Sequence, residues 1–417
     1  MLRRIRVKGF KSLHDVEAEL APLVVVFGPN AVGKSNLLEA VELMSRIVLS
    51  RTLADAFDTP RGYPTESFTL PQTGLPGLLE QSNVKLSLEG TIAPGEGDLL
   101  RYRVAVSTAP ILGSLELADE YLTRLRKDET PKSGFKPRIE RDEDQILIRR
   151  NGEQGEPRHE TLGLNHAVAS NLQFSGKRYL DIDRLRGELG GWRVYYLDPR
   201  SAMRSGQPPR QVEDIGAQGQ FLAPFLYRLK KSEPHRRRFD AVGRAMRAAI
   251  PSIESLDVDL DPQRGTLDIA IVQNGTPFSS RVVSEGTLRI LALCAIGANP
   301  WPGSLVAFEE PENGVHPRRI ETVVQLLLKL VEDGRRQLIV TTHSPLVVSS
   351  MLRHQRKSPG QVKLLRCFQS GTQTRVEPFD ALPLFEDHEI AKSLRSEDDL
   401  DEDILMEKML RRGWLDG

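Results

Sequence analysis

The 417-residue sequence has no excess charge of either sign, because 57 lysine and arginine residues balance 57 aspartate and glutamate residues. No global field therefore attracts nucleic acid or an anionic membrane, and any such surface must be a local patch. The only two cysteines, Cys294 and Cys367, argue against a disulfide scaffold and fit a reducing compartment. No apolar run approaches the roughly 18 residues of a membrane span, and residues 1–9 lack the apolar core of a signal peptide. We therefore expect a cytoplasmic protein with no membrane partner.

The order of apolar and polar residues predicts a succession of strands and helices. Alternation over residues 2–20 indicates two strands that turn around Lys11 and Ser12. Residues 51–97 are rich in proline and glycine and indicate loops, followed by strands around 84–88 and 100–106. The remaining pattern predicts a charged helix near 115–126, a hairpin that turns at Asn151 and Gly152, a buried strand over 192–197, a helix pair over 218–250, a strand meander over 251–283, an acidic solvated linker over 397–403 and a last helix over 404–414.

Residues 28–35 read Gly-Pro-Asn-Ala-Val-Gly-Lys-Ser and directly follow the apolar run 23–27. Glycines at these positions let a loop wrap closely around phosphate oxygens, and the loop amides together with the start of the following helix attract negative charge. Lys34 would reach the β- and γ-phosphates of a nucleotide, and the Ser35 hydroxyl would ligate Mg²⁺. The spacing and the strand-loop-helix context predict a phosphate-binding loop.

A second apolar run, residues 304–308, ends in the adjacent carboxylates Glu309 and Glu310. Successive strand residues point to opposite faces, so one carboxylate could hold Mg²⁺ and the other could orient or deprotonate an attacking water. His343 ends another buried strand pattern, where open α/β sheets bind ligands, and could sense a γ-phosphate. Alone, the carboxylates fit a solvated strand end and the histidine fits a structural role. The phosphate-binding loop favours the functional interpretation.

Residues 283–289 read Val-Ser-Glu-Gly-Thr-Leu-Arg and precede an apolar helical pattern. Ser284 could cap this helix, whose free amides and positive end would then face an anion. A helix cap with no ligand explains this segment equally well.

In this order, the segments GPNAVGKSN, SEGTLR, FEEPENGVHP and TTHSP resemble the ABC-type ATPase heads of the RecF, structural-maintenance-of-chromosomes and overcoming-lysogenisation-defect group. The match covers roughly residues 1–45 and 280–350, and more loosely 190–280. The resemblance implies an α/β fold, namely an ABC-type P-loop NTPase head with a mixed β-sheet flanked by helices and an inserted α+β lobe. It divides the chain into an N-terminal half of the head (1–110), the inserted lobe (111–250), a C-terminal half of the head (251–355) and a tail (356–417).

The resemblance also implies a role for each matched residue, with ATP and Mg²⁺ as cofactors. Glu310 and His343 would be catalytic, whereas Ser35 and Glu309 would hold the metal. Two heads would enclose two ATP molecules, so that the signature around Ser284 completes the site of the other copy in a homodimer or higher oligomer. The residues implied to contact nucleotide are Asn30, Ala31, Val32, Gly33, Lys34, Ser35 and Asn36, then Lys11 and Ser12, and finally Ser284 and Gly286.

The sequence departs from the wider family at two positions, where Glu309 replaces an aspartate and the signature lacks its second glycine. Both variants resemble the overcoming-lysogenisation-defect branch. The glutamine-loop residue has only two weak candidates, Gln72 and Gln81. That branch often carries a C-terminal Toprim nuclease domain, whose acidic strand pattern is missing after residue 351. We therefore expect an effector, a nuclease or toxin, on a separate chain.

These observations predict an ATP-hydrolysing switch that acts in bacterial phage defence or DNA repair. Two alternatives remain open at this point: a slow or inactive nucleotide-binding scaffold that assembles a partner, and a transporter ATPase subunit, which the RecF-like opening strands disfavour. DNA is a possible partner, and its best candidate surface is equally well explained as a solvated helical face. This surface comprises Lys230, Lys231, Arg236, Arg237, Arg238, Arg244 and Arg247.

Overall fold

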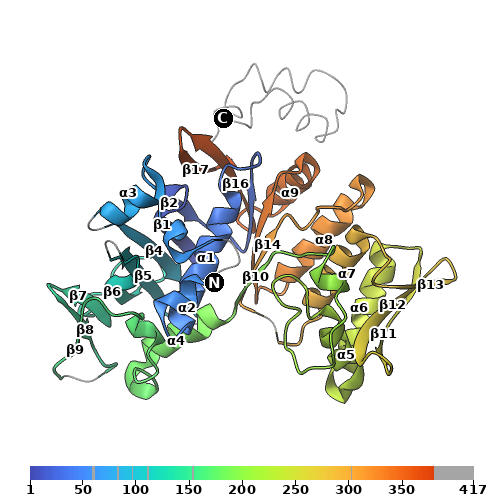
Figure 1. The fold of residues 1–417 in the computed structure, drawn as a ribbon, viewed down its shortest axis with the longest axis horizontal. Helices are drawn as coiled ribbons and strands as arrows, with labels where there is room; N and C mark the ends of the chain where they lie inside the picture. The colour runs from blue at the N-terminus through green and yellow to red at the C-terminus, as the bar shows by residue number, and fades with distance from the viewer. Residues whose placement is uncertain are drawn as a thin grey trace.

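The computed structural model describes residues 1–58, 62–81, 84–95, 97–109, 112–152, 155–301 and 303–379, and within these ranges the strands form three sheets. A six-stranded sheet occupies the centre of the molecule (Figure 1). An eight-stranded antiparallel sheet lies to one side of it, and a three-stranded meander with its helices lies to the other. The acidic linker and the last helix predicted after residue 396 lie outside the described residues.

The central sheet runs in the order β10-β14-β15-β3-β16-β17, and all neighbours are parallel except the last pair. Its two faces are both buried. Val24 and Val26 of β3 pack on the side of α1, whereas Leu23, Val25 and Phe27 pack on the side of α7, α8 and α9. Burial on both faces explains why these strands read as continuous apolar runs. The strands are β3 (Leu23–Phe27), β10 (Trp192–Tyr195), β14 (Leu305–Glu309), β15 (Gln337–Thr342), β16 (Val362–Ser370) and β17 (Gln373–Pro378).

Four helices cover this sheet. Helix α1 (Lys34–Leu49) follows the phosphate-binding loop and packs between the central sheet and the antiparallel sheet. Helices α7 (Glu285–Gly297), α8 (Ile320–Val331) and α9 (Pro345–Lys357) bury their apolar residues in the core on the opposite face. Their apolar stripes at helical spacing face the sheet, as expected for helices on an α/β core.

The eight-stranded sheet begins with the two strands predicted before the phosphate-binding loop, and that prediction is confirmed. Its order is β2-β1-β4-β5-β6-β7-β8-β9. The strands are β1 (Leu2–Phe10), β2 (Leu13–Glu19), β4 (Lys85–Ile92), β5 (Leu99–Thr108), β6 (Leu115–Leu125), β7 (Ile139–Asp142), β8 (Gln145–Ile148) and β9 (Arg158–Thr161). The helices beside it are α2 (Leu53–Phe57), α3 (Gly74–Glu80) and α4 (Leu180–Gly190).

One prediction for this region is wrong, and another is confirmed only in part. The charged helix near 115–126 is strand β6, because its charges serve cross-strand pairs: Arg103 of β5 donates to Asp119 at 2.8 Å. Asn151 and Gly152 do lie between two antiparallel strands, β8 and β9, as the hairpin prediction requires, but β8 ends at Ile148 and β9 begins at Arg158, so the connection is longer than a two-residue turn. The Asn151 side chain donates to Asp181 at 2.7 Å.

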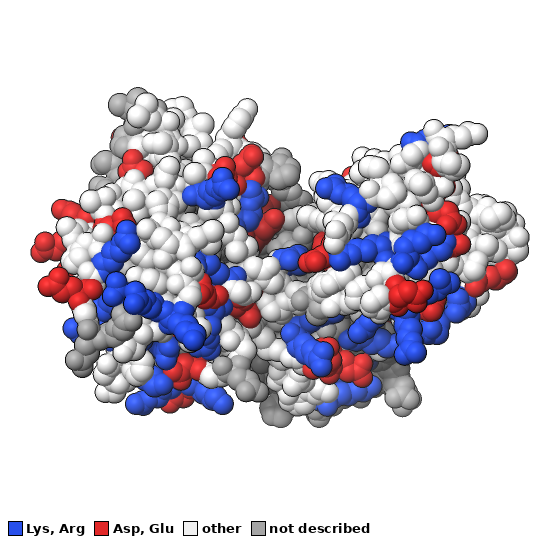
Figure 2. All heavy atoms as spheres, turned by 90° about the horizontal axis from the view of Figure 1, so that it is seen from below, with Lys and Arg blue, Asp and Glu red and all other residues white. Residues whose placement is uncertain are grey.

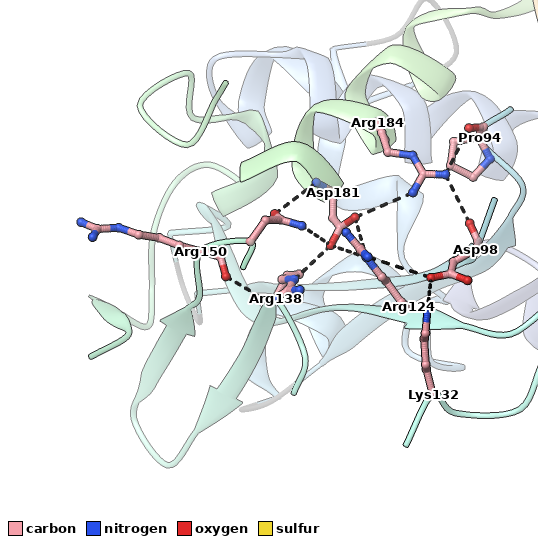
Figure 3. A network of polar contacts seen from close by, with 9 residues as sticks. Pro94, Asp98, Arg124, Lys132, Arg138, Arg150, Asp181 and Arg184 are labelled. Carbon is pink, nitrogen blue, oxygen red and sulfur yellow. Dashed lines mark hydrogen bonds and ion pairs between the residues drawn. The ribbon is translucent and has the colours of Figure 1, made fainter. Parts of the chain in front are cut away.

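Asp181, at the start of α4, joins this helix to the antiparallel sheet (Figure 3). Its side chain is fully buried and accepts hydrogen bonds from the Nε atoms of Arg124 at 2.8 Å and Arg138 at 3.0 Å. Burial opposes ionisation, but these donors together with Asn151 hold the pKa of the Asp181 carboxyl below its ordinary value. The buried carboxylate is therefore compensated by charge and by hydrogen bonds.

The helix pair and the meander predicted after residue 217 are confirmed. They are α5 (Leu222–Lys231), α6 (Arg236–Ala249), β11 (Ile253–Asp261), β12 (Thr266–Gln273) and β13 (Thr276–Ser279). They do not belong to one inserted lobe with β6 to β9: α5 and α6 share the core of α7, whereas β6 to β9 extend the sheet that begins with β1 and β2. The expected tail also begins inside the head, because β16 pairs with β3. Sequence spacing alone could not reveal these long-range pairings.

Among the residues that the structure describes, no helix combines the length and the apolar character needed to cross a membrane.

Candidate nucleotide-binding site

The phosphate-binding loop, residues 28–35, connects the end of β3 to the start of α1. Gly28 and Gly33 have positive φ angles of 155° and 100°. A Cβ atom on Gly28 would collide with the backbone carbonyl of Cys367, and one on Gly33 would collide with the Thr374 hydroxyl. Glycine is therefore required at both positions by conformation and by close packing. Asn30 and Ala31 are exposed at the tip of the loop, whereas Val32 is buried beneath it.

The side chain of Lys34 points back into the phosphate-binding loop. Its Nζ donates to the carbonyl oxygens of Gly28 at 2.8 Å and Pro29 at 2.6 Å, and it lies 3.9 Å from Oε1 of Glu310. Burial lowers the pKa of Lys34, and nearby carboxylates, Glu310 first among them, oppose that shift. The ammonium group is thus held by carbonyls that a phosphate could replace.

Ser35, in the first turn of α1, and Glu309, at the end of β14, meet at one edge of the central sheet. Glu309 pairs in register with Thr341 of β15, which lies between β14 and β3. The Ser35 hydroxyl donates directly to the Glu309 carboxylate. Hydroxyl and carboxylate oxygens are the ligands that Mg²⁺ prefers. No group of three or more His, Cys, Asp or Glu residues that could hold a metal occurs among the described residues. Mg²⁺ here would be held by Ser35 and Glu309 together with phosphate oxygens and water.

Glu310 is turned away from the strand by an unusual backbone conformation, with φ of 44°. Its amide donates to the carbonyl of Thr341 at 3.0 Å. Its carboxylate is held on both oxygens, because Oε1 lies 2.9 Å from Nδ1 of His343 and Oε2 accepts from Nδ2 of Asn313 at 2.7 Å. The structure thus brings Glu310 and His343 together and places the Glu310 carboxylate near the ammonium group of Lys34.

The residues after Glu310 contain contacts that sequence reasoning missed. Glu312 is buried and accepts from the Thr342 hydroxyl through Oε1, while Oε2 has no hydrogen-bond partner within the described part of the chain. Burial raises the pKa of the Glu312 carboxyl. In the sequence these residues appear only as part of the matched segment FEEPENGVHP, and no local signal shows which of its polar residues becomes buried.

The turn between β1 and β2 reaches the side of the loop. Lys11 has φ of 48° and forms an ion pair with Glu39 of α1. Asn36 donates from Nδ2 to the Ser12 hydroxyl at 2.8 Å. Lys11, Ser12 and Asn36 therefore lie beside the loop, each engaged with another protein group.

The helix-cap prediction at Ser284 is confirmed: its hydroxyl accepts from the amide of Thr287 at 3.2 Å, at the start of α7. Ser284 is exposed, and its hydrogen bonds stay within its own helix turn rather than reaching the phosphate-binding loop. A Cβ atom on Gly286 would lie 2.7 Å from the carbonyl oxygen of Gly314. This glycine therefore lets α7 pack against the segment that follows Glu310.

The glutamine-loop position stays unassigned. Gln72 and Gln81 are both exposed near the two ends of α3, beside the antiparallel sheet. At the edge of the central sheet, Arg200 follows β10 and donates from Nε to Glu285 at 2.8 Å. This contact joins the end of β10 to the segment around Ser284, and no motif in the sequence indicated it.

A glycine loop at a helix start, a lysine and a hydroxyl in the first turn of that helix, and two carboxylates at the end of a nearby parallel strand define the site of a P-loop nucleoside triphosphatase. The chain belongs to the family described as "AAA domain, putative AbiEii toxin, Type IV TA system", whose profile matches residues 23–349.

Three comparisons place the chain more closely. It is 36% identical to the OLD nuclease of Thermus scotoductus over 72 residues, which are 17% of this chain and 11% of that protein. It is 31% identical to the DNA replication and repair protein RecF of Thermosynechococcus vestitus over 121 residues, which are 28% of this chain and 30% of that protein. The chain thus matches less than a third of the length of either relative.

The fold is similar to that of an Smc head crystallised with the C-terminal winged-helix domain of ScpA. The TM-score is 0.52 at 14% sequence identity, with 91% of this chain and 98% of that chain covered. The resemblance to ABC-type ATPase heads of the RecF and overcoming-lysogenisation-defect group, and the α/β head fold that it implied, are confirmed.

Proposed function

We propose that the protein binds and hydrolyses ATP with Mg²⁺ and that bound ATP joins two copies of the chain. One observation carries the catalytic part of this proposal. The ends of β3, β14 and β15 bring Lys34, the Ser35–Glu309 pair and the Glu310–His343 pair to one edge of the central sheet.

Nucleotide binding would use the loop as it stands. The backbone amides of residues 30–33 and those of the first turn of α1 would face the phosphates. Lys34 would exchange the carbonyls of Gly28 and Pro29 for the β- and γ-phosphate oxygens, which carry full negative charge. Because the ammonium group is buried, this exchange compensates its charge better than the carbonyl dipoles do.

Hydrolysis would use the second carboxylate. Glu310 accepts the proton of the water that attacks the γ-phosphorus, while His343 and Asn313 fix the orientation of its two oxygens. Ser35 and Glu309 would hold Mg²⁺, which when bound neutralises charge on the β- and γ-phosphates. The products are ADP and phosphate.

Pairing of two copies would use Ser284. Its exposed position at the start of α7 leaves the helix end accessible to an anion from another chain, such as the γ-phosphate in a second copy. We place this switch in phage defence or DNA repair, with a separate nuclease or toxin chain as effector. The family description and the names of the two curated relatives support this setting.

The ATP-binding part is tested by Lys34→Ala, measured by titration calorimetry with ATP. We expect no detectable ATP binding by a variant whose thermal unfolding shows that it is folded. Lys357→Ala, at the exposed end of α9, is the matched control and should bind like the wild type. Wild-type affinity in folded Lys34→Ala would refute the phosphate-binding assignment.

DNA binding is a second candidate function, and one observation favours it. Five arginines on α6 are exposed, and none forms an ion pair with an acidic residue in the described part of the chain. They are Arg236, Arg237, Arg238, Arg244 and Arg247. Figure 2 shows basic side chains gathered over the lobe that carries α5 and α6, with acidic ones between them. Lys230 of the predicted cluster differs from these arginines, because its Nζ forms ion pairs with Asp257 at 2.6 Å and with Asp259 at 2.7 Å.

The test of this second function is the salt dependence of duplex binding. Each phosphate contact contributes a log–log slope of about −0.9. Neutral replacement of Arg236, Arg237 and Arg238 by glutamine should therefore flatten the slope by about 2 to 3. An unchanged slope would assign these arginines to solvent.

A further inference from the structure

The hairpin of β16 and β17 extends the central sheet beside β3, the strand that leads into the phosphate-binding loop, because β16 pairs in parallel with β3 (Figure 1). The backbone carbonyl of Cys367 on β16 limits the space at Gly28. Phe379, just after β17, packs edge-to-face on Phe27 with ring centroids 5.0 Å apart. Thr374 of β17 reaches the loop itself, and it is almost fully buried, with 2% of its surface exposed.

Thr374 forms three hydrogen bonds at this position. Its hydroxyl donates to the carbonyl of Val32 at 2.7 Å, and it lies 2.6 Å from the hydroxyl of Ser12. Its amide donates to the carbonyl of Ser12 at 2.9 Å. The residue therefore ties the β1–β2 turn and the phosphate-binding loop to the same strand.

The directions of these hydrogen bonds follow from counting protons. A hydroxyl has one proton, and that of Thr374 is used on the carbonyl of Val32, which can only accept. In the pair with Ser12, the proton must therefore come from Ser12. Asn36 in turn donates its amide proton to Ser12. The result is a continuous chain of donors from Asn36 through Ser12 and Thr374 to Val32, in which each bond polarises the next.

This chain changes the role expected of Ser12. Because its proton points to Thr374, the Ser12 hydroxyl has none to donate to a phosphate oxygen while the chain is intact. The chain also explains why residue 33 is glycine, since a Cβ atom there would collide with the hydroxyls of both Thr374 and Ser12. Loop conformation, turn position and hairpin are thus fixed together.

We propose that Thr374 is a positioning residue for nucleotide binding, which holds the phosphate-binding loop and the Ser12 turn in the geometry that accepts ATP. The role of ATP rests on the proposed function above. Thr374 itself lies behind the loop and acts through Val32 and Ser12. It makes the C-terminal hairpin a part of the nucleotide site, more than 330 residues from the loop in sequence.

Three variants test this role. Thr374→Val keeps the shape and removes the hydroxyl, whereas Thr374→Ser keeps the hydroxyl. Thr372→Val makes the same chemical change two residues away, at an exposed position in the turn between β16 and β17. The readouts are ATP affinity by calorimetry and hydrogen exchange of the backbone amides of Gly28 and residues 30–33 without nucleotide.

We expect Thr374→Val to bind ATP about tenfold more weakly, because the buried carbonyl of Val32 loses its strong donor. Its loop amides should exchange faster before any nucleotide is added. The ATP affinity of Thr374→Ser should stay within about twofold of the wild-type value, and Thr372→Val should bind ATP like the wild type. A folded Thr374→Val with wild-type affinity and wild-type exchange would overturn the positioning role.

Ser12→Ala interrupts the same chain of hydrogen bonds at Ser12. It is the alternative test if Thr374→Val fails to fold, because Ser12 is only half-buried. If the two hydroxyls act as one unit, the double variant should bind ATP no more than about twofold more weakly than Thr374→Val. In Ser12→Ala alone, weaker binding with unchanged loop exchange would overturn positioning in favour of direct contact. If the wild type does not bind ATP, the proposed function fails. Faster loop exchange in Thr374→Val would then still show that Thr374 holds the loop.

Discussion

Replacing Glu310 by glutamine should separate the two proposed activities, ATP binding and ATP hydrolysis. Glutamine has nearly the same shape and keeps oxygen and nitrogen atoms within reach of His343 and Asn313, which lie 2.9 and 2.7 Å from the carboxylate oxygens. The substitution removes the carboxylate that is proposed to accept the proton of the attacking water. General-base catalysis contributes about 100-fold to 10,000-fold to a rate, so turnover should fall by a factor in that range. ATP affinity should stay the same or become tighter, because one negative charge is removed from a site that receives phosphates.

Phosphate release under single-turnover conditions measures this rate, and calorimetry measures the affinity in the same preparation. His343→Ala provides a graded comparison, because it removes one of the two groups that orient Glu310 and leaves the base in place. Its turnover should fall about tenfold, well short of the loss in Glu310→Gln. Turnover by Glu310→Gln at the wild-type rate would refute the general-base role and leave Glu309 or His343 as the candidate.

Three further predictions concern stability, pH and metal. Asp181→Asn should lower the free energy of unfolding, measured by urea denaturation, by about 3–5 kcal/mol, because Arg124 and Arg138 lose a buried counter-charge. The control Asp183→Asn changes a partly exposed neighbour and should lower the free energy of unfolding by about 1 kcal/mol or less. Equal losses in the two variants would contradict this prediction. Burial raises the pKa of Glu120 from 4.5 to about 7, so the folded state keeps a proton that the unfolded chain loses, and about 3 kcal/mol of stability present below pH 4.5 should be lost as pH rises through 7. Glu120→Gln should remove this part of the pH dependence, and an unchanged profile would refute it. Glu309→Gln should raise the Mg²⁺ concentration that gives half-maximal turnover at least about tenfold, and an unaltered requirement would assign the metal elsewhere.

The sequence predicted which residues lie together at the centre of the candidate site, because local rules determine their positions. The spacing of Gly28, Gly33 and Lys34 determines a loop at a helix start, and carboxylates after parallel strands must meet it at one sheet edge. Ser35 and Glu309 are 274 residues apart and still meet as expected. Ser284 caps its helix for reasons contained within three residues.

The misses arise where pairing partners are distant and no motif marks them. Strand β6 carries charges at helical spacing, but Asp119 is used by Arg103 of the neighbouring strand. Nothing in the sequence marks Thr374. It contacts Val32 only because β16, which precedes its strand β17, pairs with β3. Asp181 of α4 is buried where Arg124 of β6 and Arg138, the residue before β7, converge on it. In each case tertiary contacts override the local pattern.

Pairing of two chains by ATP is the central claim, and light scattering of Glu310→Gln with Mg²⁺ and ATP tests it most directly. Without turnover, the sample should have twice the mass of a single chain, and it should return to the single mass when ATP is withheld. Adding Ser284→Asp keeps the helix cap, because aspartate caps as well as serine, but places a negative charge against the facing γ-phosphate. The double variant should therefore bind ATP and remain a single chain. A single-chain mass for Glu310→Gln saturated with ATP, or an ATP-dependent pair in the double variant, would contradict the account.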